Sequence, residues 1–190
     1  MSLRFGSTRL NWYGIVLLCI AAAVVYGIVH DQVTARVCIE YFTIAHPPMV
    51  KSQSPTVLGF AWGAAATWWV GALLGVVLAT CCDAGSWPKI SPRELVTPIL
   101  IMLVLMAVLA TTAGFIGYYV GIGEEQTEWW ILEGIPEKKM ARFSADAWAH
   151  LASYSFGALG GIVLWTWAIL HRRKLAHDLP ARPPASPPAR

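Results

Sequence analysis

Three histidines and one aspartate interrupt a chain that is otherwise mostly apolar, and their side chains are the best suited to chemistry. His30 and Asp31 directly follow one apolar run, His46 comes shortly after them, and His150 lies inside another apolar run. Imidazoles together with carboxylates form a donor set that suits Zn, Fe or Mn. Two imidazoles on facing helices would also suit haem b. Either kind of site needs a fold that brings together residues far apart in the sequence.

The composition indicates that this fold lies in a lipid bilayer. Of the 190 residues, 56% are hydrophobic and 13% are charged, about half the charged share of a typical soluble domain. Four runs lack Asp, Glu, Lys and Arg and approach or exceed the roughly 20 residues that a span requires: residues 12–29, 56–79, 95–122 and 147–170. The predicted fold class is therefore all-α, an integral membrane four-helix bundle. It forms one four-span domain over residues 1–178, and the proline-rich residues 179–190 predict a disordered tail.

The basic residues indicate how the chain is oriented. With four spans, both termini and the middle loop share one side of the membrane. Seven basic residues lie on that side: Arg4, Arg9, Lys89, Arg93, Arg172, Arg173 and Lys174. On the other side, six glutamates dilute five basic residues. By the positive-inside rule, both termini are cytoplasmic and loops 31–55 and 123–146 lie outside. The net charge of +3 is thus an orientation signal, and no nucleic-acid partner is predicted.

A short interfacial helix is predicted after the first span, over residues 31–42. Apolar residues recur every four positions on one face, while Arg36 and Glu40 lie on another face and can form a pair four residues apart. Part of the local charge is therefore expected to be an ordinary solvated helix face.

Residues 30–48, HDQVTARVCIEYFTIAHPP, resemble a segment of small four-helix inner-membrane proteins of bacteria. The resemblance covers about a tenth of the chain and implies a multi-pass protein of a bacterial inner membrane. It implies no activity and no cofactor.

His30 and His150 are predicted to lie at similar depth near the outer surface. His30 comes 18 residues after the start of the first span, roughly 27 Å, and His150 lies 20 residues before the inner end of the fourth, roughly 30 Å. Ionisable residues at membrane depth are costly and often mark function when they face the bundle interior. The predicted metal ligands are His30, His150, Glu124, Glu125 and His46. The polar cluster predicted around them is Asp31, Arg36, Glu40, Asp146 and Tyr118.

Three interpretations of this cluster stay open. It can be an interhelical hydrogen-bond network, a metal or haem site, or a route for protons or solutes. No HExxH or Glu-x-x-His spacing selects the metal site. For Asp146 the sequence also offers a purely structural role, in the first turn of the fourth helix behind Ser144 as its N-cap.

Small residues recur every four positions along the second span. They are Gly59, Gly63, Thr67, Gly71, Gly75 and Ala79. In a membrane such a ridge lets two helix backbones approach closely. It predicts packing within the bundle, and the alternative is contact with other membrane subunits through Gly59, Gly63, Gly71 and Gly75.

The function predicted first is that of a small multi-pass inner-membrane protein. It would be a non-catalytic subunit, or an envelope- or transport-associated factor, whose outward polar cluster contacts an ion or a partner. The alternative is a membrane-embedded metal- or haem-binding redox protein that uses His30 and His150. No nucleophile–base spacing indicates hydrolase or transferase chemistry, so a protein that is not an enzyme is favoured. The four cysteines predict no disulfide framework and leave the reactivity of Cys38 and of Cys81–Cys82 open.

Overall fold

The structure, a computed structural model, describes residues 4–122 and 134–178. It contains four long helices: α1 (Arg4–Val37), α3 (Pro55–Asp83), α4 (Pro92–Ile122) and α5 (Met140–His177). Two short elements accompany them, α2 (Ile39–Thr43) and the 3₁₀ helix η2 (Glu137–Lys139), and the described residues form no strand. The predicted all-α four-helix bundle is confirmed. Each long helix includes a stretch long and apolar enough to cross a membrane.

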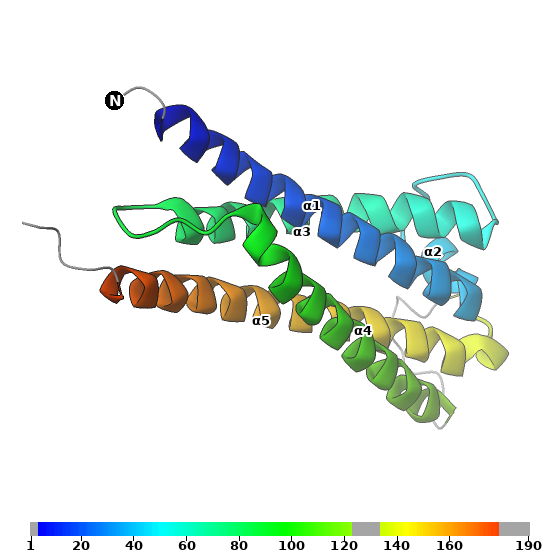
Figure 1. Cartoon of the computed structure of the whole chain (residues 1–190). Helices are drawn as coiled ribbons and strands as arrows, with labels where there is room; N and C mark the ends of the chain where they lie inside the picture. Colours follow the sequence, from blue (N-terminus) through cyan, green and yellow to red (C-terminus); the bar gives the residue numbers. More distant parts are fainter. Residues whose placement is uncertain (1–3, 123–133, 179–190) are drawn as a thin grey trace, which may run out of the picture.

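The four long helices form two pairs. α1 lies along α3, and α4 lies along α5, while the two pairs meet mainly through α3 and α5 (Figure 1). The start of α1, the loop between α3 and α4, and the end of α5 gather at one end of the bundle. α2 and the start of α5 lie at the other end (Figure 1). This arrangement places residues near the end of α1 beside residues near the start of α5.

The outward-facing surface of the bundle is apolar. Val104 of α4 is 61% exposed, and Leu151 and Val163 of α5 are 68% and 65% exposed. Contiguous apolar surface of this kind is rare on soluble proteins. In a bilayer it faces lipid, where a helix satisfies all its backbone hydrogen bonds internally. The surface therefore agrees with the four apolar helices in indicating a membrane protein.

The small-residue ridge of α3 packs against α1. A Cβ atom added to Gly63 would stand 2.6 Å from backbone atoms of Gly27 and Ile28, and one added to Gly71 would stand 2.7 Å from the carbonyl oxygen of Cys19. A Cβ atom added to Gly59 would stand 3.0 Å from the carbonyl group of Asp31. The ridge thus brings two helix backbones into direct contact within one chain. A second subunit could use the same glycines only by displacing α1.

A buried arginine stabilises the end of the bundle that carries the α3–α4 loop and the end of α5. The Arg172 side chain on α5 is 3% exposed. Its guanidinium donates to four backbone carbonyls at 2.5–3.1 Å: Cys81 in the last turn of α3, its C-cap Ala84, and Trp87 and Pro88 in the loop to α4. The first two of these bonds satisfy carbonyls at the end of α3, where the helix itself supplies no partner. Arg172 therefore fixes α5 to the α3–α4 loop.

Two predicted boundaries are wrong. α1 does not give way to a surface helix at residue 31 but continues to Val37, because its inner face goes on burying Asp31, Thr34 and Ala35. The chain turns at Cys38, whose backbone is extended (φ −147°, ψ 98°), and the interfacial helix that follows is only α2.

At the other boundary, α5 begins at Met140, earlier than the N-cap predicted at Ser144. Met140 and Phe143 pack with Cys38 and Ile135, which gives these extra turns of helix an apolar partner. Ser144 and Asp146 consequently lie inside the helix and are buried, so neither caps its start.

Candidate functional site

A buried cluster of His30, Asp31 and His150 lies where α1 meets α5. The Nε2 atom of His150 lies 3.2 Å from Oδ1 of Asp31. The imidazole rings of His30 and His150 meet edge to face, with centroids 4.7 Å apart. One donor atom from each of the three residues falls within 4.8 Å of the other two. Asp31 is 5% exposed, His150 is 8% exposed and His30 is half-buried, so the cluster is largely shielded from bulk water.

The hydrogen bonds of His150 indicate that a proton or a metal cation lies between Nε2 of this ring and the carboxylate of Asp31. The Nδ1 atom of His150 lies 2.8 Å from the backbone carbonyl of Asp146. Because a carbonyl only accepts, Nδ1 carries the hydrogen, and Nε2 of the neutral ring is then a lone pair. That lone pair faces a carboxylate oxygen, which also offers lone pairs. A proton or a metal cation placed between the two atoms makes the contact favourable.

Two further polar atoms near the cluster lack a partner. Nε2 of His30 and Oδ2 of Asp146 are buried, and neither has a hydrogen-bond partner among the described residues. A buried polar atom without a partner costs about 1–3 kcal/mol. Such atoms are uncommon in native proteins, where a bound ion or water often supplies the missing partner. The cluster therefore has both a donor set and unused hydrogen-bonding capacity.

Aromatic rings form a continuous series from α2 and the residues that follow it into the cluster. Tyr41 of α2 stacks on His150 with a centroid distance of 4.4 Å, and His46 contacts Tyr41 at 4.8 Å. Tyr26, one turn earlier on α1, stacks on His30 with a centroid distance of 5.8 Å. His46, a predicted ligand, is thus one ring removed from the cluster, and its Nδ1 lies 2.7 Å from the carbonyl of Tyr41. Sequence reasoning missed Tyr41 because its spacing matched the apolar face of a surface helix.

The predicted pair of Arg36 and Glu40 does not form. α1 ends at Val37, so the two residues lie on different helices and lose the spacing of four. Arg36 donates to Gln32 and, at 2.8 Å, to the hydroxyl of Thr56. Glu40 pairs instead with Lys139 at 3.3 Å.

Tyr118 does not belong to the cluster. Tyr118 lies on an exposed part of α4 and lines a groove between α1 and α4. Glu124 and Glu125 lie outside the described residues, as does the proline-rich stretch 179–190. Of the ten candidate residues, the structure brings His30, Asp31 and His150 together.

Cys38, at the turn between α1 and α2, is a buried thiol. It is fully buried, and its Sγ donates to Oε2 of Glu40 at 3.4 Å. Burial, together with the hydrogen bond to Glu40, raises the pKa of the Cys38 thiol to about 12. Burial also raises the pKa of Glu40, but its hydrogen bonds with its own backbone, Cys38 and Lys139 outweigh burial and lower that pKa. Glu40 therefore stays a carboxylate that holds the thiol protonated.

We expect Cys38 to resist alkylation at pH 8. With a raised pKa the protonated thiol predominates, and the thiolate is the form that reacts. In a variant with Cys19, Cys81 and Cys82 replaced by alanine, iodoacetamide should label Cys38 at less than about a tenth of the rate measured after denaturation. Gln53→Cys in a chain without the four native cysteines gives a matched exposed thiol in the connection between α1 and α3. Equal labelling rates for Cys38 and this control would contradict the described burial.

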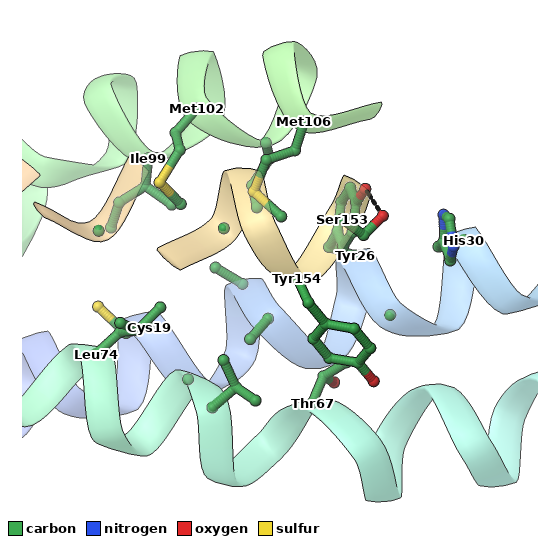
Figure 2. A pocket seen from close by; sticks show the side chains of 18 of the residues that line it. Cys19, Tyr26, His30, Thr67, Leu74, Ile99, Met102, Met106, Ser153 and Tyr154 are labelled. Atoms are coloured by element: carbon green, nitrogen blue, oxygen red, sulfur yellow. Dashed lines mark hydrogen bonds between the residues drawn. The ribbon is translucent and has the colours of Figure 1, made fainter. Parts of the chain in front are cut away.

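An apolar cavity of about 110 Å³ extends from the cluster into the middle of the bundle. The hydroxyls of Tyr26 and Ser153 form a hydrogen bond of 2.9 Å beside it (Figure 2). Beyond this bond the lining is apolar and sulfur-rich, and a cavity of this character stays dry. Figure 2 labels its walls: Cys19, Tyr26 and His30 of α1, Thr67 and Leu74 of α3, Ile99, Met102 and Met106 of α4, and Ser153 and Tyr154 of α5.

The fold and the cluster together define the class of protein. Four apolar helices indicate a membrane protein, and a buried His–Asp–His group lies at one end of its bundle. No protein-family model matches the chain, and no curated protein or solved structure matches it either.

Proposed function

We propose that this membrane protein binds one divalent transition-metal ion through His30, Asp31 and His150. The observation that carries the proposal is the contact between Nε2 of His150 and Oδ1 of Asp31, at 3.2 Å in a buried site. Both atoms offer lone pairs to the space between them. The ring of His30 adds a third donor, and its Nε2 has no other partner among the described residues.

The donor set decides which ions fit. Two imidazoles and one carboxylate suit Zn²⁺, Fe²⁺ or Mn²⁺, and three protein ligands leave a coordination position open. Ligand atoms bound about 2.1 Å from an ion lie about 3–3.5 Å apart, so separations as large as 4.8 Å would contract by about 1.3–1.8 Å. Haem b fits less well, because a porphyrin would have to enter between two rings that already touch at 4.7 Å.

Two neighbouring groups hold the ring of His150 in a position suited to a metal ligand. The backbone carbonyl of Asp146 accepts the hydrogen of Nδ1 of His150, which orients Nε2 toward Asp31. A bond of this kind typically fixes the tautomer and ring orientation of a metal-binding histidine. Tyr41 covers the same ring on its outer side. The site is therefore supported by two elements besides α1.

We further propose that the protein lies in a bacterial inner membrane with both termini in the cytoplasm. The support is the excess of Lys and Arg at the end of the bundle that carries the termini, which includes Arg93, Arg173 and Lys174. In this orientation the metal site lies near the outer face. A non-catalytic subunit, or an envelope- or transport-associated factor, would use the site for ion contact on that face.

Metal analysis tests the proposal. The protein purified in detergent and equilibrated with Zn²⁺, Fe²⁺ or Mn²⁺ should hold about one ion per chain, as measured by elemental analysis after removal of free metal. His150→Ala and His30→Ala should each lower the affinity at least tenfold, because each removes one of three ligands. Asp31→Asn should act similarly while keeping the shape of the side chain.

The matched control is His171→Ala. His171 lies on the same helix as His150, but its ring stacks on Trp167 at 5.1 Å near the opposite end of the bundle. This variant should bind metal as the unaltered protein does, and bound metal should raise the melting temperature of both. A protein that stays metal-free at saturating ion would overturn the proposal. If the protein showed a visible haem spectrum that His30→Ala and His150→Ala abolished, the ligand of the site would be haem and not a single metal ion.

A further inference from the structure

The apolar cavity in the middle of the bundle adjoins the proposed metal site. All three proposed ligands, His30, Asp31 and His150, line the cavity, and its lining continues along α1 to Cys19, about three turns of helix away. The volume of the cavity is about 110 Å³. In another protein, an engineered apolar cavity of about 150 Å³ binds benzene or xenon. The cavity beside the metal site therefore has room for one molecule smaller than benzene.

The lining of the cavity disfavours charged and hydrated ligands. Apart from the three proposed ligands, no charged side chain lines it among the described residues. The hydroxyls of Tyr26 and Ser153 bind each other (Figure 2), and the hydroxyl of Thr67 donates to the backbone carbonyl of Gly63. A buried water needs two to four polar partners, and an ion that entered would lose its hydration shell. The occupant that fits is small, uncharged and apolar.

Two rings of α2 cover His150. Tyr41 stacks on the imidazole at 4.4 Å, and Phe42, which is 3% exposed, meets it edge to face at 5.8 Å. α2 thus occupies part of the space around the site, whereas the cavity adjoins all three proposed ligands. A molecule in the cavity is therefore next to the atoms that would hold the ion.

The donor set suits an apolar gas when the ion is iron. Two imidazoles and one carboxylate, with coordination positions left open, form the donor set of ferrous sites that use dioxygen. Zn²⁺ has no redox chemistry and does not share this property. Dioxygen is uncharged, apolar and smaller than benzene. Like other apolar solutes, it is more soluble in hydrocarbon than in water, so a bilayer around the bundle would supply it.

We propose that the cavity holds an uncharged diatomic gas, dioxygen above all, and delivers it to a ferrous ion bound by His30, Asp31 and His150. The gas would bind at the ion's open coordination position. Because the ion is part of it, this inference rests on the proposed function, and it adds the identity of the ion and the class of ligand that the ion receives. The cavity itself can be tested without metal.

Xenon tests the cavity in the metal-free protein. The full chain in detergent, with isotope-labelled methionine methyl groups, would be followed by NMR under increasing xenon pressure. Met102 and Met106 line the cavity, whereas Met49 and Met140 do not. The methyl signals of Met102 and Met106 should shift and reach saturation. Met49 is exposed and Met140 is buried elsewhere, so neither signal should show a saturable shift.

Two adjacent alanines of α1 provide a matched pair of variants. Ala22 lines the cavity, whereas Ala21 is exposed and does not. Ala22→Phe should fill the cavity and abolish the saturable shifts, and Ala21→Phe should leave them unchanged. If Ala22→Phe lowers the melting temperature, Leu103→Trp and Leu105→Trp repeat the comparison on α4, because Leu103 lines the cavity and Leu105 is 56% exposed.

Nitric oxide tests the delivery of a gas to the ion. The protein would be loaded with Fe²⁺ in the absence of oxygen and mixed rapidly with nitric oxide, and the EPR signal of the ferrous nitric oxide complex would be followed in time. The unaltered protein and Ala21→Phe should bind one nitric oxide per iron at the same rate. Ala22→Phe should keep its iron but bind nitric oxide at least about tenfold more slowly, because the added ring blocks the cavity.

The outcomes separate this inference from the proposed function. Equal rates for Ala22→Phe and Ala21→Phe, both with full iron content, would overturn delivery through the cavity. Unchanged signals of Met102 and Met106 under xenon would overturn the cavity as a binding site. A protein that binds Zn²⁺ but not Fe²⁺ would keep the proposed function and overturn this inference. If no ion binds, the proposed function fails, and delivery to the ion fails with it even where xenon enters the cavity.

Discussion

Replacing Gly63 with alanine is expected to lower the melting temperature of the protein in detergent by roughly 5–10 °C, which corresponds to about 2–3 kcal/mol. The added methyl group would stand 2.6 Å from backbone atoms of both Gly27 and Ile28. No side-chain rotation relieves a clash with backbone, so α1 and α3 would have to separate. The higher helix propensity of alanine, about 1 kcal/mol, offsets only part of this cost.

Gly114→Ala is the matched control, because it makes the same change inside another helix. Its added methyl group would lie 3.4 Å from the nearest atoms of Ala145 and Ala149, which is an ordinary contact. Thermal unfolding of the two variants, followed by circular dichroism, should therefore differ clearly. An unchanged melting temperature for Gly63→Ala would contradict the close α1–α3 contact.

The same substitution should also weaken metal binding. The ridge of α3 positions the site, since Gly59 lies against the backbone of Asp31 and Gly27 lies one turn before it on α1. When α1 moves away from α3, Asp31 moves relative to His150 on α5. Loss of metal at a temperature where the protein remains folded would connect the helix packing to the site.

Replacing Arg172 with alanine is expected to destabilise the protein by about 3–5 kcal/mol and to lower its melting temperature by roughly 10 °C. The substitution removes four hydrogen bonds from a charged donor and leaves the carbonyls of the α3–α4 loop without that donor. Arg172→Lys should recover only part of the loss, because one ammonium group cannot reach the same carbonyls as a planar guanidinium.

Arg173→Ala removes the same charge from the next position and provides the control. Arg173 is exposed, and exposed charges contribute little to stability. Its melting temperature should stay within roughly 2 °C of the unaltered protein. If the two variants were equally stable, Arg172 would have no structural role beyond its charge.

Sequence reasoning was most successful where depth in the membrane decides position. The absence of charge from four long runs predicted the four helices, since a bilayer admits few other spanning structures. Residue counts from the span ends placed His30 and His150 at similar depth, and the rings meet with centroids 4.7 Å apart. Depth follows from a rise of 1.5 Å per residue, so it can be counted along the chain.

Sequence reasoning failed where the position of a helix end depends on contacts with another element. The pair of Arg36 and Glu40 was wrong because the chain breaks at Cys38, and Ser144 and Asp146 are not at a helix end because α5 starts earlier. Both errors arose where a short segment finds an apolar partner from another element, such as Phe143 beside Cys38. The sequence pattern of one segment does not indicate which residue of another element will pack against it.

By itself, then, the sequence determined the membrane class, the helix count and the shared depth of His30 and His150. Only the tertiary structure decided that Asp31 faces Nε2 of His150, that Tyr41 covers the ring, and that His46 stays one ring away. The physical reason is that helices apolar on nearly every side have no face that the hydrophobic effect selects. Close contacts of small residues and a few buried polar atoms choose the rotation of each helix, and these contacts exist only once the helices have met.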